Sequence, residues 1–253
     1  MKIVVNPKYS YLRSWIEQIP SFFEEEGRVV YRARNLLKVF TLESGMDVNV
    51  KKYKTPCLLN RIVYSFFRKT KASRAYCNTI KIIEKGFDAA EAIAYIEIKR
   101  NGLFSDGYFI SLQCHQVKEI REYCAGPLSG NENLIDEFTR YSAKMHDAGI
   151  YHLDYSPGNI LICNSDGKYA FILVDVNRMK FMPVSFDAGC RNFSRLFVDD
   201  EIYKRIGLIY SQSRKNTFTK EEVILLIIKY KNRFFKKRAC KKQIKSLFMK
   251  FHV

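Results

Sequence analysis

Three short apolar runs, separated by turn residues, lie between residues 28 and 53. The runs cover residues 28–33, 36–42 and 47–53, and Arg34-Asn35 and Glu43-Ser44-Gly45-Met46 stand between them. β-branched and aromatic residues are abundant in all three runs, which is typical of strands joined by tight turns. This pattern predicts an antiparallel meander.

Apolar residues recur at helical spacing in two later segments. These segments are residues 58–85, which Gly86 follows, and residues 133–148, which Gly149 follows. A glycine in this position commonly ends a helix. Between these segments, residues 92–99 and 108–113 flank the turn signal Asn101-Gly102 and predict a strand pair. Short strands are also expected at residues 159–163 and 169–174, and the remainder is expected to be mostly helical.

This order of elements predicts an α+β protein with two lobes. Most predicted strands come first and most helices afterwards, which is typical of a chain that builds a sheet and a helical part separately. We therefore expect an N-lobe over residues 1–113 and a C-lobe over residues 114–253. The length of 253 residues suits one large domain or two lobes.

Composition excludes several classes of protein. The chain is 47% hydrophobic and 27% charged, so it is neither disordered nor collagen-like. Its most apolar run, residues 223–228, is far too short to cross a bilayer. No signal-peptide pattern follows Lys2, and the seven cysteines lack Cys-x-x-Cys spacing, which favours core thiols in a reducing cytoplasm over a zinc site.

The formal net charge of +17 indicates an anionic surface nearby. Residues 223–253 contain no acidic residue and ten basic ones, which interleave with aromatic and aliphatic side chains. This pattern is typical of an amphipathic helix on an anionic membrane, but it also suits the solvated face of a helix that packs on the C-lobe. Nucleic acid is the less favoured partner, because no RNA- or DNA-binding motif is visible and the basic cluster adjoins an apolar helix.

A polar loop follows the predicted helix over residues 133–148. It reads His-x-Asp-x-x-x-x-Asn from His152 to Asn159, and the next apolar strand ends at Asp175. Phosphoryl transfer from ATP uses one carboxylate to deprotonate the acceptor hydroxyl, and an amide with a second carboxylate to hold magnesium on the phosphates. We therefore predict Asp154 as the base, Asn159 and Asp175 as Mg²⁺ ligands, and His152 as a brace of the loop. The alternative is a surface loop in which Asp154 and Asn159 only cap turns.

A lysine that grips ATP phosphates is expected on the strand over residues 47–53. Val48-Asn49-Val50-Lys51 fits the lysine strand of kinases. Alternation puts Val48 and Val50 on the face opposite Lys51, which favours Lys51 over the neighbouring Lys52.

Taken together, these residues resemble the protein-kinase-like superfamily and, within it, the bacterial lipopolysaccharide core kinases that phosphorylate Kdo or heptose. The resemblance covers roughly residues 28–200 and includes Val174-Asp175-Val176-Asn177-Arg178, where Asp-x-Asn-Arg replaces the Asp-Phe-Gly of protein kinases. The segment Cys190-Arg191-Asn192-Phe193-Ser194-Arg195-Leu196 is similar to the stretch that follows in that family. The resemblance implies a bilobal protein-kinase-like fold with a small β-rich N-lobe and a larger, mainly helical C-lobe.

The chain departs from the protein-kinase pattern around its expected lysine. No Gly-x-Gly-x-x-Gly precedes Lys51, so we expect the Arg34-Asn35 turn to cover the phosphates. Tyr76-Cys77-Asn78 occupies the place of the glutamate that pairs with this lysine, which leaves Glu84 as the candidate partner.

A further departure concerns the acceptor. Ser156 stands where protein kinases have a second catalytic lysine, two residues after the base. This favours a small-molecule or glycolipid acceptor over a protein.

These features lead to the expected function: ATP-dependent phosphorylation of a Kdo or heptose hydroxyl in the lipopolysaccharide inner core. The enzyme is expected in the cytoplasm, peripheral at the anionic inner-membrane surface, with ATP and Mg²⁺ as cofactors and the core glycolipid as partner. A soluble small-molecule or protein kinase is one rival. A pseudokinase, or a protein that binds anionic lipid or nucleic acid without turnover, is the other.

Overall fold

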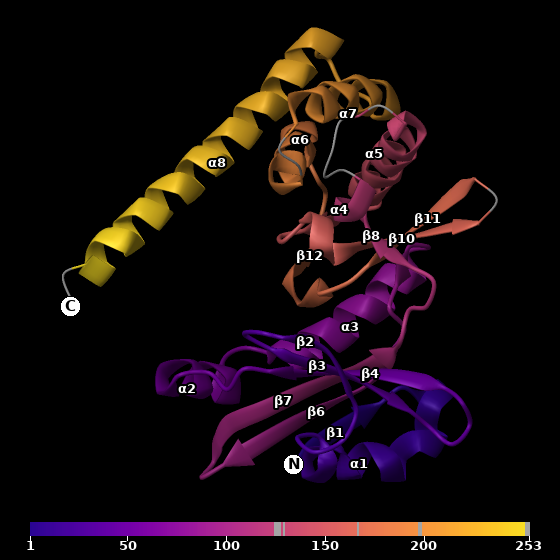
Figure 1. Ribbon diagram of the computed structural model, residues 1–253, viewed down its shortest axis with the longest axis vertical. Coiled ribbons are helices and arrows are strands. Elements are labelled where there is room, and N and C mark those ends of the chain that lie inside the picture. The colour runs from indigo at the N-terminus through magenta and orange to yellow at the C-terminus, as the bar shows by residue number, and fades with distance from the viewer. Residues whose placement is uncertain (124–127, 129, 166, 197–198, 251–253) are drawn as a thin grey trace. The chain divides into compact units, whose positions relative to one another are not determined.

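The computed structural model of the protein describes residues 1–123, 128, 130–165, 167–196 and 199–250, with the backbone alone for residues 165 and 245–250 (Figure 1). The chain divides into two compact units. The first comprises Met1–Gln116 and Leu173–Arg178, and the second comprises Val117–Ile172 and Met179–Val253. The short segment around Asp175 thus belongs to the first unit, although it lies between two stretches of the second.

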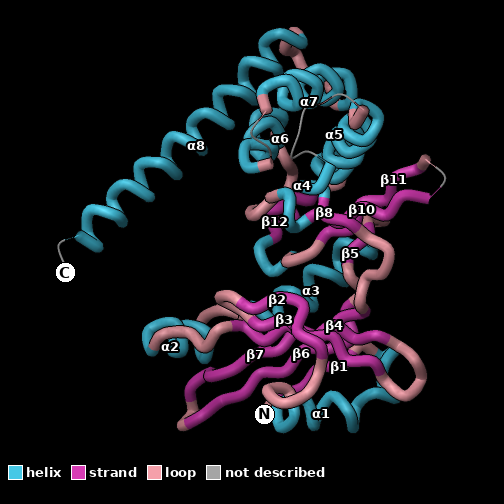
Figure 2. Tube along the Cα trace, in the orientation of Figure 1, coloured by secondary structure: helices cyan, strands magenta, loops and turns pink. Residues whose placement is uncertain are grey.

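A six-stranded antiparallel sheet forms the centre of the first unit (Figure 2). Its order is β1-β6-β7-β4-β3-β2. The strands of this unit are β1 (Lys2–Val5), β2 (Arg28–Arg32), β3 (Leu36–Thr41), β4 (Asp47–Tyr53), β5 (Asp88–Ala89), β6 (Ala92–Arg100) and β7 (Leu103–Leu112). The expected meander is β2-β3-β4, and the expected strand pair is β6-β7. Asn101 and Gly102 both have positive φ angles, of 52° and 76°, as a tight two-residue hairpin turn requires.

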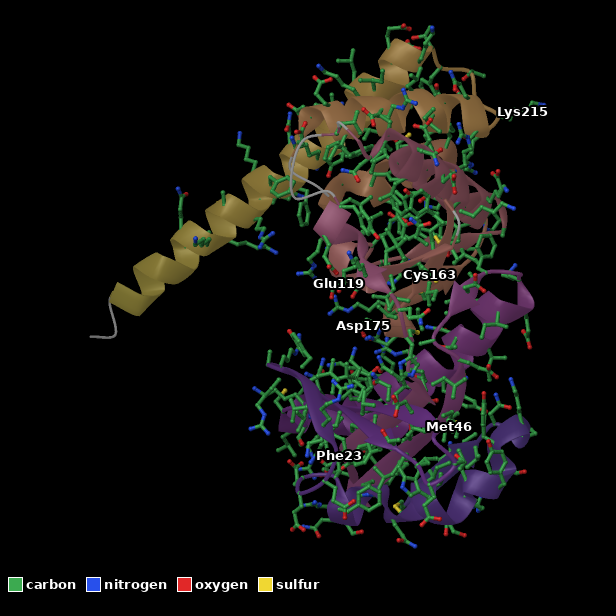
Figure 3. All side chains as sticks on the ribbon, turned by 45° about the vertical axis from the view of Figure 1, so that its right-hand side comes forward. Phe23, Met46, Glu119, Cys163, Asp175 and Lys215 are labelled. Carbon is green, nitrogen blue, oxygen red and sulfur yellow. The ribbon has the colours of Figure 1, made fainter. Side chains whose placement is uncertain are left out.

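Helices cover both faces of this sheet. The helical segments of the unit are η1 (Pro7–Leu12), α1 (Arg13–Phe22), α2 (Leu58–Phe66), α3 (Lys71–Glu84) and η3 (Val176–Arg178). On one face, Ile16 and Ile19 of α1 and the following Phe23 are fully buried in one cluster with Val48 and Val50 of β4. Phe23 is labelled in Figure 3. On the other face, α3 packs through a smaller cluster that consists of Tyr53, Ala72, Tyr76, Ala92 and Tyr95.

The alternation of β4 separates its two lysines. Val48 and Val50 are buried, so successive side chains point to opposite faces of the sheet. Lys52 Nζ donates to Glu24 Oε1, just after α1, whereas Lys51 Nζ donates to Asp175 Oδ1. Only Lys51 therefore points to the face that η3 and α3 share.

The second unit is mainly helical, with short strands beside its loops. Its strands are β8 (Lys118–Glu119), β9 (Ile150–His152), β10 (Ile160–Ser165), β11 (Lys168–Leu173) and β12 (Met179–Phe181). Its helical segments are α4 (Ile120–Tyr123), α5 (Glu132–Asp147), η2 (Pro157–Asn159), α6 (Phe186–Asn192), η4 (Phe193–Arg195), α7 (Asp200–Ser213) and α8 (Lys220–Lys250). Four aromatic rings, of Phe138, Tyr155, Phe171 and Phe193, pack together in its core. Gly149 ends α5 in the left-handed conformation, with φ 73°, as its place in the sequence predicts.

The two halves of α8 differ in their surroundings. Val223 and Ile227 are fully buried, and the Lys231 ammonium pairs with Asp200 of α7. Residues 236–244 are exposed, and this half of α8 extends away from the other helices of its unit (Figure 1). The first half of the basic tail is therefore a helix that packs on its own unit, which is one of the two alternatives drawn from the sequence. Lys245, Leu247, Phe248 and Lys250 lie outside the described side chains, and Phe251 lies outside the described residues.

Several features differ from the sequence-based expectations. The N-terminal β1, η1 and α1 were not anticipated, and residues 58–85 form two helices because the hydroxyl of Thr70 caps the start of α3. Cys57 and Cys240 are exposed, so the expectation of core thiols is wrong for these two. In the part of the chain that the structure describes, no helix is long and apolar enough to cross a membrane.

Candidate active site

In the first unit, Lys51 of β4 is held against Asp175, which comes 124 positions later. Lys51 Nζ lies 2.6 Å from Asp175 Oδ1 and 5.4 Å from the centre of the Tyr53 ring. The side chains of Lys51 and Asp175 are 17% and 30% exposed. Since the pair is partly shielded from water, its attraction is stronger than that of an ion pair on the open surface.

The backbone at Asp175 is strained. Its φ angle is 53°, in the left-handed region that costs a non-glycine residue about 1–2 kcal/mol. Two asparagines fix the conformation: Asn177 Nδ2 donates to Asp175 Oδ1 at 2.6 Å, and Asn78 Nδ2 of α3 donates to the carbonyl of Val176 at 2.7 Å. A strained residue that its neighbours hold in place is typical of functional sites.

In the second unit, Arg195 of η4 holds Asp154. Arg195 Nη1 lies 2.6 Å from Asp154 Oδ1 and also donates to the carbonyl of Leu153 at 3.2 Å. The Phe234 ring of α8 stacks on the guanidinium, with its centre 5.2 Å from Cζ. The Asp154 side chain is 31% exposed, so the carboxylate is both oriented and accessible to a solute. Sequence reasoning did not find Arg195, although it noted the segment that contains it.

The loop from His152 to Asn159 is braced from within. The buried His152 ring accepts the backbone N–H of Asp154 on Nδ1 at 3.0 Å, which is the bracing role expected for it. Asn159 Nδ2 donates to the carbonyl of Asp154 at 2.8 Å. The amide nitrogen of Asn159 is thus used inside the loop, and its carbonyl oxygen is the atom that can face a cation.

The residues predicted to bind a metal suit a hard divalent cation. They offer the Asp175 carboxylate from the first unit and the Asn159 amide oxygen from the second, and oxygen ligands of this kind are those that Mg²⁺ prefers. Among the described residues, no group of three His, Cys, Asp or Glu side chains forms a metal cage. Each unit thus offers one oxygen ligand, and a cation bound to either one would need the oxygens of a nucleotide to complete its coordination.

A buried hydrogen-bond chain supports the loop from behind. Asn192 Nδ2 donates to the His152 carbonyl at 2.9 Å, and Asn192 Oδ1 bonds to His146 Nε2 at 3.0 Å. His146 Nδ1 bonds to the Tyr210 hydroxyl at 2.9 Å, and Gly189 leaves the room for this contact, because a Cβ there would lie 1.8 Å from that hydroxyl. Burial lowers the pKa of His146 to about 4, so the ring is neutral at physiological pH.

The structure does not bring Glu84 to Lys51. Glu84 is exposed in the last turn of α3, and in the described part of the chain the carboxylate that contacts Lys51 is that of Asp175. Asn78, which lies nearer the middle of α3, bonds to the backbone beside Asp175 instead. The expected pairing of Glu84 with Lys51 is replaced by a direct contact between the lysine and Asp175.

The expected turn Arg34-Asn35 connects β2 and β3. Asn35 Oδ1 accepts the backbone N–H of Lys54 at 3.3 Å, which ties the turn to the end of β4. Arg34 is exposed, and its charge acts on Lys71 at the start of α3.

Cations gather around the start of α3, which sequence reasoning did not anticipate. Lys71 Nζ lies 5.9 Å from the centre of the Tyr53 ring, the same ring that Lys51 approaches. Burial lowers the pKa of Lys71, and the charges of Arg34, Arg178 and Arg74 lower it further. Burial and neighbouring arginines also lower the pKa of Arg74. Cations that repel one another in this way favour an anion between them.

The model of the lipopolysaccharide kinase (Kdo/WaaP) family matches residues 21–200, a range that contains Lys51, Asp154, Asn159 and Asp175. The chain belongs to this family. It is therefore a kinase, as predicted, and the family implies ATP as the phosphoryl donor.

Among 1113 chains of solved structures that match, one is WaaP in complex with acyl carrier protein. It is 14% identical, with a TM-score of 0.63, and the match covers 94% of this chain and 99% of that one. The likeness confirms the predicted α+β, protein-kinase-like fold of this lipopolysaccharide kinase. No curated protein matches the chain.

The Arg195 contact predicts a positioning role. Replacing Arg195→Met should lower kcat by about tenfold, because Asp154 is no longer held in one orientation. The dissociation constant for Mg-ATP should change by less than about twofold, since the contacts of Arg195 are with the loop and with Phe234 of α8. Arg195→Lys should restore part of kcat. A rise in KM with unchanged kcat would contradict this role.

The neutral, buried His146 predicts a pH dependence of stability. In the unfolded chain the His146 ring is protonated below about pH 6.5, whereas in the folded chain it is protonated only below about pH 4. The free energy of unfolding should therefore fall as the pH drops from 6.5 to 4, by at most about 3 kcal/mol from this group. Urea unfolding across this range should show a smaller slope for His146→Gln than for the native chain. Equal slopes would mean that His146 is already protonated in the folded state.

Proposed function

We propose that this lipopolysaccharide kinase transfers the γ-phosphoryl group of ATP to a hydroxyl of Kdo or heptose in the lipopolysaccharide inner core. The contact between Lys51 Nζ and Asp175 Oδ1 carries the proposal. It joins a lysine able to bind phosphates to a strained carboxylate able to bind a cation, as phosphoryl transfer requires.

The roles follow from the chemistry of each group. Asp154 accepts the proton of the sugar hydroxyl, whose oxygen then forms a bond to the γ-phosphorus while the bond to the β-phosphate oxygen breaks and ADP leaves. Lys51 binds the phosphates. Asn159 and Asp175 would hold Mg²⁺, which would supply positive charge to the phosphates. No covalent enzyme intermediate is needed, since positioning and electrostatics supply the catalysis.

The cations at the start of α3 take the place of a glycine-rich loop. Protein kinases cover the phosphates with backbone N–H groups of such a loop, but this chain has the Arg34-Asn35 turn there. Within the first unit, Arg34 and Arg178 each act electrostatically on Lys71. We propose that they bind the phosphates of ATP through charge, and that residues 1–113 form the nucleotide-gripping lobe and residues 114–253 the catalytic lobe.

The proposed acceptor determines the place in the cell where the kinase acts. A core glycolipid is embedded in a membrane, so the proposed enzyme acts in the cytoplasm as a peripheral protein of the inner membrane. The net charge of +17 supports attraction to anionic lipids. Nucleic acid remains the less favoured partner, because no motif for binding it is present.

Two substitutions separate the base from the metal ligand. Asp154→Asn should leave Mg-ATP affinity nearly intact and lower phosphoryl transfer on the order of a hundredfold or more. Asp175→Ala should weaken nucleotide binding only when magnesium is present. Isothermal titration with and without magnesium, beside a transfer assay, measures both. Full activity of Asp154→Asn would show that Asp154 is not the base. Unchanged magnesium-dependent nucleotide binding by Asp175→Ala would show that Asp175 is not a metal ligand.

The substrate class is tested in cells. Mass spectrometry of the lipid A-core from cells that lack this protein should show the loss of one phosphate group. An unchanged core would exclude the proposed substrate and leave a soluble acceptor as the alternative.

The exposed half of α8 predicts a salt-dependent attraction to acidic lipids. Replacing Lys236, Lys237, Arg238, Lys241 and Lys242 by Gln removes five exposed cations, each worth about 1 kcal/mol near an anionic surface. The variant should leave anionic vesicles at low salt and keep its Mg-ATP affinity. Because these residues lie beyond the packed half of α8, the melting temperature should stay near that of the native chain. Unchanged sedimentation at low salt would exclude this contribution.

A further inference from the structure

Helix α2 and the residue that follows it carry five large apolar side chains that are exposed to solvent. Leu58, Leu59, Ile62, Phe66 and the following Phe67 are 61%, 72%, 38%, 67% and 81% exposed. None of the nine residues of α2 is buried. Large apolar side chains gathered in this way mark an interaction site rather than ordinary surface.

Other residues of α2 attach it to the sheet. Arg61 Nε donates to the carbonyl of Phe104 in β7 at 2.8 Å, and the Phe104 N–H donates to Ser65 Oγ at 2.8 Å. The Tyr64 ring packs against the edge of Phe104, with 5.7 Å between ring centres. These contacts fix the orientation of the helix, which lies beside the sheet of the first unit (Figure 2).

The exposed side of α2 forms one stripe. At 100° per residue, Leu58, Leu59, Ile62 and Phe66 fall within an arc of about 100°. Tyr64 lies about 170° and Arg61 about 110° from the middle of this arc, whereas Ser65 adjoins its edge beside Leu58. The stripe is thus apolar, and the helix that carries it is held in place by contacts that lie beside the stripe at Ser65 and away from it at Arg61 and Tyr64.

Along the chain, the charged residues on either side of the stripe are of a single sign. Residues 48–83 contain nine basic residues and no acidic one. Lys54 precedes the helix, Arg68 and Lys69 follow it, and all three are exposed. An apolar helix face flanked by cations is complementary to a bilayer with anionic headgroups, because the side chains reach the acyl region while the cations stay among the phosphates.

We propose that α2 inserts its exposed stripe into the surface of an anionic lipid bilayer and thereby docks the first unit on the membrane. A second copy of the chain fits the stripe less well. The helix is only about 13 Å long, and its face is too small to supply the roughly 800 Å² per partner that a stable interface buries. The inference rests on the proposed function only in expecting that this membrane carries the acceptor.

The test compares two double variants in vesicle co-sedimentation. Leu59→Gln with Phe66→Gln removes two side chains of the stripe. Leu225→Gln with Tyr11→Gln is the matched control, since these side chains are 67% and 69% exposed but lie elsewhere. On vesicles of phosphatidylglycerol and phosphatidylethanolamine, the stripe variant should bind at least about tenfold more weakly than the native chain, and the control should bind within about twofold of it.

Salt separates this contact from that of the α8 tail. Loss of the stripe should weaken binding at both low and high salt, because burial of apolar side chains is not screened, whereas the tail acts mainly at low salt. In a chain with Trp15→Phe and Phe66→Trp, the single tryptophan should be quenched by brominated phospholipid. Absence of quenching, or equal binding by the stripe variant and the native chain, would overturn the proposal.

Two further readouts identify the cause of a positive or negative result. Sedimentation velocity without lipid reports a dimer, and a dimer that the stripe variant abolishes would assign the stripe to a second copy instead. Phosphorylation of a water-soluble, deacylated core oligosaccharide should be the same in the stripe variant and the native chain. If the native chain lacks this activity, the proposed function fails, while the vesicle result still decides the role of α2.

Discussion

The ion pair between Lys51 and Asp175 is the polar contact around which the candidate site of the first unit is built. It brings residues 173–178, which interrupt the second unit in sequence, onto the face of the sheet that α3 covers. Asn78 and Asn177 then hold Asp175 in a left-handed conformation that a free chain would leave. The same few polar contacts therefore attach α3 to residues 173–178 and hold Asp175 in its strained conformation.

Local signals were sufficient for the elements that surround the site. The meander of β2, β3 and β4 followed from apolar runs between turns, and Asn101-Gly102 adopts the positive φ angles that its hairpin needs. Gly149 ends α5 directly before the loop that holds Asp154. Each of these features depends on residues within one turn or one strand, where sequence patterns act directly.

The contacts that complete the site could not be predicted in the same way. Arg195 reaches Asp154 across 41 positions and Lys51 reaches Asp175 across 124, so both pairs depend on the folded packing. Glu84, near the end of α3, was the predicted partner of Lys51, but the left-handed turn at Asp175 supplies the carboxylate that contacts the lysine. The N-terminal strand β1 pairs with β6, more than 80 residues away, which its short apolar run does not indicate.

The positive charge of the chain is divided between two segments that lack acidic residues. Residues 48–83 carry nine cations and residues 223–253 carry ten, and the segments lie in different units. In each segment, exposed apolar or aromatic side chains accompany the cations, whereas binding ATP alone would need charge without an exposed apolar face. Under the proposed function, a kinase whose acceptor is held in a bilayer gains from staying at that surface, because confinement raises the effective concentration of acceptor around the proposed base, Asp154. Two separate cationic segments bind such a surface more firmly than either does alone, since the second contact forms within an already bound molecule.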